Sequence, residues 1–188
     1  ESKSPSSHLE ILGDLVTIRE AIVSRQIKPP HFLDALIKKA AHALKFFRTP
    51  SGNLAMFNGS KQETKFLIDK ILNQADGKAR GRGPMSLSKS GYEKLVCQGI
   101  TVFVDTHYDS KKKSSKAPHA MEINIGKTRL LGSCGTIYKK EKKWKDSLLS
   151  ASAHSALILE NTNAFYCDEL TDFTSNKRYQ KNGSEIVF

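Results

Sequence analysis

The sequence predicts an α+β protein in which a short helical segment precedes an antiparallel β-sandwich. Apolar residues recur at helical spacing over residues 7–47 and again over 61–75. Beyond residue 84 the apolar residues fall instead in short β-branched or alternating runs, separated by Gly, Asn, Asp and Ser. Because the two patterns are segregated along the chain, we expect two structural units, a helical segment with its connector over 1–80 and the β-sandwich over 81–188.

The helical pattern divides at turn residues. In the first helix Ser6 or Ser7 can accept the free N–H groups of the first turn, and the apolar stripe is Leu9, Leu12, Leu15, Val16, Ile18 and Ile22. Pro29 and Pro30 end it, and HFLDALIKKAAHALKFF repeats the pattern. After a break at Pro50 and Gly52, the sequence predicts a short strand in LAMFNGS, a third helix in KQETKFLIDKILNQA and a loop in GKARGRGP.

The second half of the chain predicts at least six strands. Each candidate is short and bounded by turn residues, which is typical of an antiparallel β domain. The runs are KLVCQG, ITVFVD, AMEINIG, TRLLGS, HSALILE and NAFYC.

Composition and charge limit the function classes. The 188 residues are 38% hydrophobic, which supports a real core, but no run approaches the roughly 18 apolar residues of a membrane span. Cys97, Cys134 and Cys167 lack CxxC spacing, which favours buried thiols over a zinc ribbon or a disulfide framework. The start, ESKSPSSHLE, has no initiating Met and no signal pattern, so we expect a removed leader or a piece of a longer protein.

The net charge of +11 favours an anionic partner such as nucleic acid, an acidic polysaccharide or a membrane surface. The basic clusters KARGR, DSKKKSSK and YKKEKKWK fall in predicted loops and are most simply solvated. Nucleic-acid binding would call for aromatic residues among the charges, and only Tyr138 and Trp144 lie near a cluster. The pattern therefore disfavours nucleic acid.

Two histidines stand at the mouths of predicted strands. His119 has the parity of Met121, Ile123 and Ile125, whereas Glu122 and Asn124 share the opposite face. This parity is typical of a hydrogen-bonded residue at the edge of the core.

His154 similarly precedes the predicted strand HSALILE, with Ala156 and Ile158 on its side. The two histidines could also bind a metal, although no third ligand lies at short spacing. His8, His31 and His42 lie on the predicted helices and are assigned no role.

Four segments resemble the carboxy-terminal part of the heparinase II/III-like polysaccharide lyases. ALKFFRTPSGNLAMFNGS is similar to the end of that family's helical toroid, and SKSGYEKL to its first sandwich strands. HAMEINIGKTRLLGSCG resembles the family's histidine-led strand, and WKDSLLSASAHSALILENTNAF its Trp, Ala-His and Thr-Asn pattern. The resemblance spans about residues 9 to 170 in consistent order and implies the last helices of an α/α toroid followed by a β-sandwich.

The resemblance implies β-elimination on an acidic, uronate-containing polysaccharide and a periplasmic or secreted location. His119 matches the sandwich histidine that faces the toroid cleft, so it is the expected catalytic residue. His154 matches a histidine that helps to hold structural zinc in some members, which implies a supporting or metal-binding role. Ser133 stands at the acidic zinc-ligand position and Leu149 at that of an Arg, and both departures weaken the zinc site.

Three function classes remain open. The first is a lyase domain, here without most of the toroid that supplies the family's catalytic Tyr and an Asn or His. The others are a non-catalytic β-sandwich that binds acidic glycans and a basic nucleic-acid-binding module. Tyr92 and Tyr138 could each supply a phenol, but tyrosines in β domains are far more often packing residues.

Overall fold

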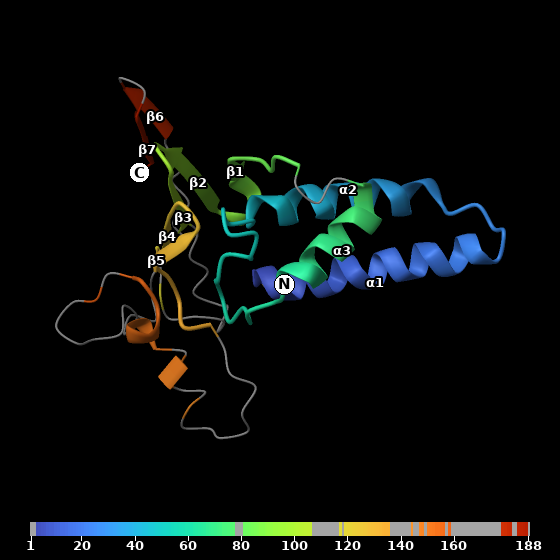
Figure 1. Cartoon of the computed structure of the whole chain (residues 1–188), viewed down its shortest axis with the longest axis horizontal. Coiled ribbons are helices and arrows are strands. Elements are labelled where there is room, and N and C mark those ends of the chain that lie inside the picture. Colours follow the sequence, from blue (N-terminus) through green and yellow to red (C-terminus); the bar gives the residue numbers. More distant parts are fainter. Residues whose placement is uncertain are drawn as a thin grey trace, which may run out of the picture.

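The computed structural model describes residues 3–77, 81–106, 117, 119–135, 144, 147–148, 150–156, 158, 178–181 and 184–187. Within these residues, α-helices come first and a five-stranded antiparallel sheet follows, which confirms the predicted α+β class. Figure 1 shows the helices on one side of the sheet, with α1 and α2 extending away from it. The helices are α1 (Pro5–Ser24), α2 (His31–Phe46) and α3 (Lys65–Asp76).

Three helices form where helical spacing predicts them, but the predicted cap of the first helix is wrong. Its N-cap is Ser4, so Ser6 and Ser7 lie inside the helix, and Ile18 of the predicted stripe is exposed. Pro5 begins α1, where its missing N–H has no intrahelical partner to lose. The Thr64 hydroxyl caps α3 by accepting from the backbone N–H of Leu67, and Gly77 ends that helix with φ of 71°. The three helices bury one apolar stripe each. The buried residues are Leu9, Leu12, Val16, Leu33, Ile37, Ala41, Leu44, Ile68, Leu72 and Ala75.

The connector between α2 and α3 differs from the prediction. LAMFNGS is not a strand, because Leu54 alone forms a bridge, to Arg48, and residues 55–57 have no regular structure. These residues are nevertheless buried from Leu54 to Phe57. The connector therefore packs into the core that the helices and the sheet share.

The sheet has the strand order β1-β2-β3-β4-β5, with every neighbouring pair antiparallel. Its strands are β1 (Ser86–Leu87), β2 (Tyr92–Cys97), β3 (Ile100–Asp105), β4 (Met121–Ile125) and β5 (Thr128–Leu131). A separate pair is formed by β6 (Arg178–Lys181) and β7 (Ser184–Val187).

The two strands predicted after residue 153 have different outcomes. Residues 154–156 and 158 lie outside any strand, so that part of HSALILE is not the predicted strand. The run NAFYC, with Cys167, lies outside the described residues, as do Tyr138, Leu149 and the cluster DSKKKSSK.

The sheet turns polar side chains toward the helical layer, opposite to the parity expected from the sequence. In β4, Glu122 is fully buried and Asn124 is 2% exposed, while Met121 and Ile125 are 36% and 50% exposed. In β3, Thr101, Phe103 and Asp105 point the same way as Glu122. His119 was predicted to lie at the edge of the core because it shares the parity of Met121. That face is turned away from the helices and His119 is exposed, so the prediction is wrong for the core that the helices and sheet share.

Aromatic rings join the sheet to the end of α2. The Phe46 and Phe47 rings lie 4.9 Å apart, and Phe46 contacts Phe103 at 5.9 Å while Phe47 contacts Tyr92 at 4.9 Å, centroid to centroid. One core thus contains side chains from both sides of residue 80, and the domain boundary there stays a prediction. None of the described helices is long and apolar enough to cross a bilayer.

Candidate functional site

His154 is held by hydrogen bonds at both ring nitrogens. It follows the short 3₁₀ helix η2 (Ala151–Ala153) and is 8% exposed. Nε2 lies 3.0 Å from the Leu148 carbonyl oxygen and Nδ1 lies 2.7 Å from Ser133 Oγ. A carbonyl only accepts, so Nε2 carries the proton, and the Ser133 hydroxyl donates to Nδ1. Burial lowers the pKa of His154, which favours this neutral ring.

This arrangement does not fit the zinc site that the family resemblance implies. A histidine ligand must offer a ring lone pair to the metal, but the Nδ1 lone pair accepts the Ser133 hydrogen bond. Ser133 Oγ itself accepts from the Gly135 backbone N–H at 3.1 Å. Among the residues that the structure describes, no group of three His, Cys, Asp or Glu side chains is placed to hold a metal.

His119 occupies a different environment. It lies in a turn two residues before β4, its side chain is exposed, and its backbone φ is 53°. A positive φ is uncommon outside glycine, although His, Asn and Asp tolerate it better than most residues. The backbone at His119 is therefore mildly strained, and its imidazole is accessible to solvent.

Backbone hydrogen bonds bring the two histidine segments together. The Met121 N–H donates to the Ser155 carbonyl at 3.0 Å, and the Cys134 N–H donates to the Ala153 carbonyl at 3.1 Å. The segment that carries His154 is thus attached to the start of β4 and to the residues after β5. The His154 side chain contacts Ser133, whereas the His119 side chain is exposed to solvent.

Tyr92 is fixed in a buried polar network. Its hydroxyl donates to the Lys3 carbonyl at 3.0 Å and accepts from Asn58 Nδ2 at 2.6 Å, while Asn58 Nδ2 also lies 3.0 Å from Asp105 Oδ2. Burial, and then the charge of Asp105, raise the pKa of the Tyr92 phenol well above its ordinary value. The phenol is therefore a structural donor at the interface between the sheet and the connector.

Glu122 forms the second buried network. Its Oε2 accepts from the Met56 backbone N–H at 2.9 Å and its Oε1 accepts from Asn124 Nδ2 at 3.1 Å. Arg129 Nε lies 3.3 Å from Oε1, close enough for an ion pair but not aligned for a hydrogen bond. The carboxylate joins the connector to the sheet, a role that strand alternation alone does not reveal.

Lys94 on β2 is another buried charge that the sequence pattern did not single out. Its Nζ lies 4.7 Å from the Phe103 ring centroid and 5.2 Å from that of Phe46, and it donates to the Arg48 carbonyl at 3.4 Å. Burial lowers the pKa of Lys94 to about 8. The amine sits just beyond the carboxyl end of α2, where a positive charge is favourable.

One curated protein matches the sequence over much of its length. FtsZ-localized protein C of Caulobacter vibrioides is 31% identical over an alignment of 141 residues, and this alignment covers 71% of this chain and 24% of that protein. No protein-family model matches the chain.

Solved structures match the whole fold. The crystal structure of heparinase III superposes with a TM-score of 0.69 at 14% identity, covering 96% of this chain and 34% of that one. Heparan sulfate lyase HepC from Pedobacter heparinus gives a TM-score of 0.67 at 16% identity, covering 95% of this chain and 31% of the enzyme. The chain shares the fold of the matched third of these lyases. At such identity the likeness shows the fold and leaves the activity to experiment.

Proposed function

We propose that this chain is a heparinase II/III-like polysaccharide lyase domain that acts by β-elimination on an acidic, uronate-containing glycan. The observation that supports this most is the fold similarity to heparinase III, which extends over 96% of the chain. The net charge of +11 suits an anionic polymer. The alternative of a nucleic-acid-binding module has no comparable structural likeness in its favour.

His119 is the proposed proton acceptor. In β-elimination a base removes the proton next to the uronate carboxylate, a C=C bond forms, and the bond to the glycosidic oxygen breaks, with that oxygen leaving as a protonated hydroxyl. A neutral imidazole can remove the first proton near neutral pH. His119 is exposed and so can reach a bound polymer, whereas the ring of His154 is already engaged by Ser133 and Leu148. His154 is accordingly proposed to support the local fold rather than to transfer the proton.

The unsaturated uronate product absorbs in the ultraviolet, so activity can be followed directly over heparin, heparan sulfate and alginate. His119→Asn is the sharpest variant, because Asn tolerates positive φ but cannot act as the base. We expect its turnover to fall by about 10²-fold or more with little change in melting temperature. His154→Ala is the matched control and should lower the melting temperature instead.

Full turnover by His119→Asn would remove His119 from the reaction. Glycan binding without any absorbance rise in the wild-type chain would replace the lyase proposal with a non-catalytic, glycan-binding module.

The likeness to FtsZ-localized protein C favours a second candidate, in which the domain serves a protein recruited to FtsZ. The sequence identity of 31% exceeds that to the lyases, although the chain spans only 24% of that protein. Co-sedimentation with purified FtsZ filaments tests this candidate. A chain that pellets only when filaments are present would support it, and one that stays in the supernatant at saturating filament concentration would contradict it.

A further inference from the structure

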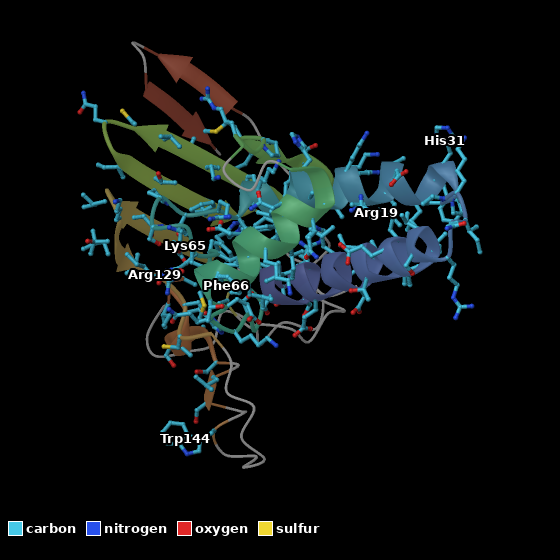
Figure 2. All side chains as sticks on the ribbon, turned by 45° about the vertical axis from the view of Figure 1, so that its right-hand side comes forward. Arg19, His31, Lys65, Phe66, Arg129 and Trp144 are labelled. Atoms are coloured by element: carbon cyan, nitrogen blue, oxygen red, sulfur yellow. The ribbon has the colours of Figure 1, made fainter. Side chains whose placement is uncertain are left out.

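A polar cavity of about 310 Å³ lies between the helical layer and the end of the sheet at which β4 turns into β5. It is lined by the turn 48–52 after α2, by Lys65 at the start of α3, by Gly81 and by Lys127 in the turn between β4 and β5. Figure 2 shows Lys65 at the end of α3 that is nearer the sheet. The volume is at the small end of the range for ligand sites, about 300–1,000 Å³.

The charges that line the cavity do not cancel. Arg48 Nη2 lies 2.6 Å from Asp69 Oδ1, so this pair is close to neutral. Lys65 and Lys127 are exposed and form no ion pair with any other described residue. The surroundings of the cavity thus hold two uncompensated positive charges beside a guanidinium whose position is set by Asp69.

The turn between Arg48 and Asn53 is closed by two backbone hydrogen bonds and leaves the cavity open. The Gly52 N–H donates to the Thr49 carbonyl at 2.9 Å, and the Thr49 N–H donates to the Asn53 carbonyl at 3.0 Å. Gly52 has a φ of 89°, and a Cβ there would lie 2.9 Å from Lys65 Cε and 3.2 Å from Arg48 Nη2. A side chain at residue 52 would therefore crowd both cations.

We propose that this cavity binds an oxyanion substituent, a sulfate ester or a carboxylate, of the acidic glycan. The identity of the polymer rests on the proposed function, whereas the preference for an oxyanion rests on Arg48, Lys65 and Lys127. A guanidinium held by Asp69, beside two exposed lysine amines, suits the three acceptor oxygens of a sulfate or the two of a carboxylate.

The cavity is remote from His119. His119 precedes β4 and Lys127 follows it, and the strand alone separates Met121 from Ile125 by about 13 Å. An anion held at Lys127 therefore does not contact the group proposed to take up the proton. The cavity acts as an anchoring subsite, and it lowers the KM of a long substrate without changing kcat.

Isothermal titration with a heparin-derived oligosaccharide, at one fixed salt concentration, tests the proposal. Lys65→Ala combined with Lys127→Ala should weaken binding by about tenfold. Lys38→Ala combined with Lys39→Ala removes the same total charge from exposed positions on α2 and should leave the affinity within about twofold. Equal weakening in the two double variants would overturn the cavity and leave only general charge attraction.

Three further arms separate the possible sources and failures. A polyuronate without sulfate distinguishes a carboxylate from a sulfate ester, and inorganic sulfate should compete with the oligosaccharide in the wild type but not in the Lys65/Lys127 variant. Tighter binding of single-stranded nucleic acid than of heparin through the same two lysines would overturn the glycan assignment. Lysine-dependent binding without lyase activity would support the cavity and contradict the lyase reaction. Lyase activity with an unaltered KM in the Lys65/Lys127 variant would support the reaction and contradict the cavity.

Discussion

The helical layer and the sheet meet at one core, but they bury different chemistry. The helices contribute aliphatic side chains such as Leu12, Ile37 and Leu44, all fully buried. The sheet contributes Phe103 together with Glu122 and Asn124. Apolar burial is non-directional and tolerates small shifts, whereas a buried carboxylate is stable only when each oxygen meets a donor. The sheet side of the interface therefore fixes the relative position of the two layers.

The largest expected effect comes from breaking that polar interface. Glu122→Ala would leave the Met56 N–H without its acceptor and Arg129 without its carboxylate, and it should lower the free energy of unfolding by about 3–5 kcal/mol. Urea denaturation measures the change. Glu122→Gln retains one acceptor oxygen and should lose less. A loss below about 1 kcal/mol for the alanine variant would mean that the carboxylate does not join the layers.

A comparable test of the helical layer removes volume rather than polarity. Ile37 is fully buried on α2, so Ile37→Ala should lower the free energy of unfolding by about 3 kcal/mol, and Ile37→Val by about 1 kcal/mol. Urea denaturation again gives both values. The loss at Ile37 should grow with the number of methyl and methylene groups removed. The loss at Glu122 should instead grow with the number of hydrogen bonds removed, and this difference distinguishes the two layers. Equal losses for the two Ile37 variants would contradict a tightly packed helical stripe.

The difference between the layers also explains what the sequence could predict. Helical spacing identified α1, α2 and α3, because each buries a stripe that its own sequence defines. Alternation in AMEINIG located β4 but not its helix-facing side, because the burial of Glu122 depends on the Met56 N–H, 66 positions away in the chain. The LAMFNGS connector was mistaken for a strand for the same reason: its apolar residues pack against both layers without forming a ladder.

The candidate site could be predicted only in part. The sequence placed His119 near the start of a strand, and the structure has it two residues before β4. It also singled out Ser133 as a poor metal ligand, but not its hydrogen bond to His154, because the two residues are 21 positions apart and no local pattern links them. The predicted strand after His154 is absent from residues 154–156, where the chain instead leaves a 3₁₀ turn.

A third prediction concerns Lys94, whose folded pKa of about 8 lies below the ordinary value of 10.5. Between these two pH values the unfolded chain holds the proton more tightly than the folded one, so the free energy of unfolding should rise as pH increases from 8 to 10.5. Urea denaturation across this range measures the rise. Lys94→Met keeps an unbranched apolar stem and should remove this contribution. An unchanged rise in Lys94→Met would assign the effect to other groups.

His154 should produce a smaller change at lower pH. Its folded pKa is lowered below the ordinary 6.5, so the unfolded chain takes up a proton first as pH falls below 6.5, and stability declines until the folded ring also titrates. Protonation would remove the lone pair that accepts from Ser133. NMR titration of the ring, beside denaturation at each pH, measures both steps. Ser133→Ala should raise the ring's folded pKa if that hydrogen bond stabilises the neutral form, and an unshifted titration would contradict the assigned donor.

The smallest effect is expected on the outer face of the sheet. Ile125 is 50% exposed and lies opposite Ile100 on β3, which is 41% exposed. Ile125→Thr keeps a β-branched side chain that suits a strand, so the free energy of unfolding should change by only about 0.5 kcal/mol. The same substitution in the helical layer, Ile37→Thr, would bury a hydroxyl in an apolar stripe and should lower stability by more than about 3 kcal/mol. A loss above about 2 kcal/mol for Ile125→Thr would mean that this face is covered in solution, and the contrast between the two layers would then concern only the face that meets the helices.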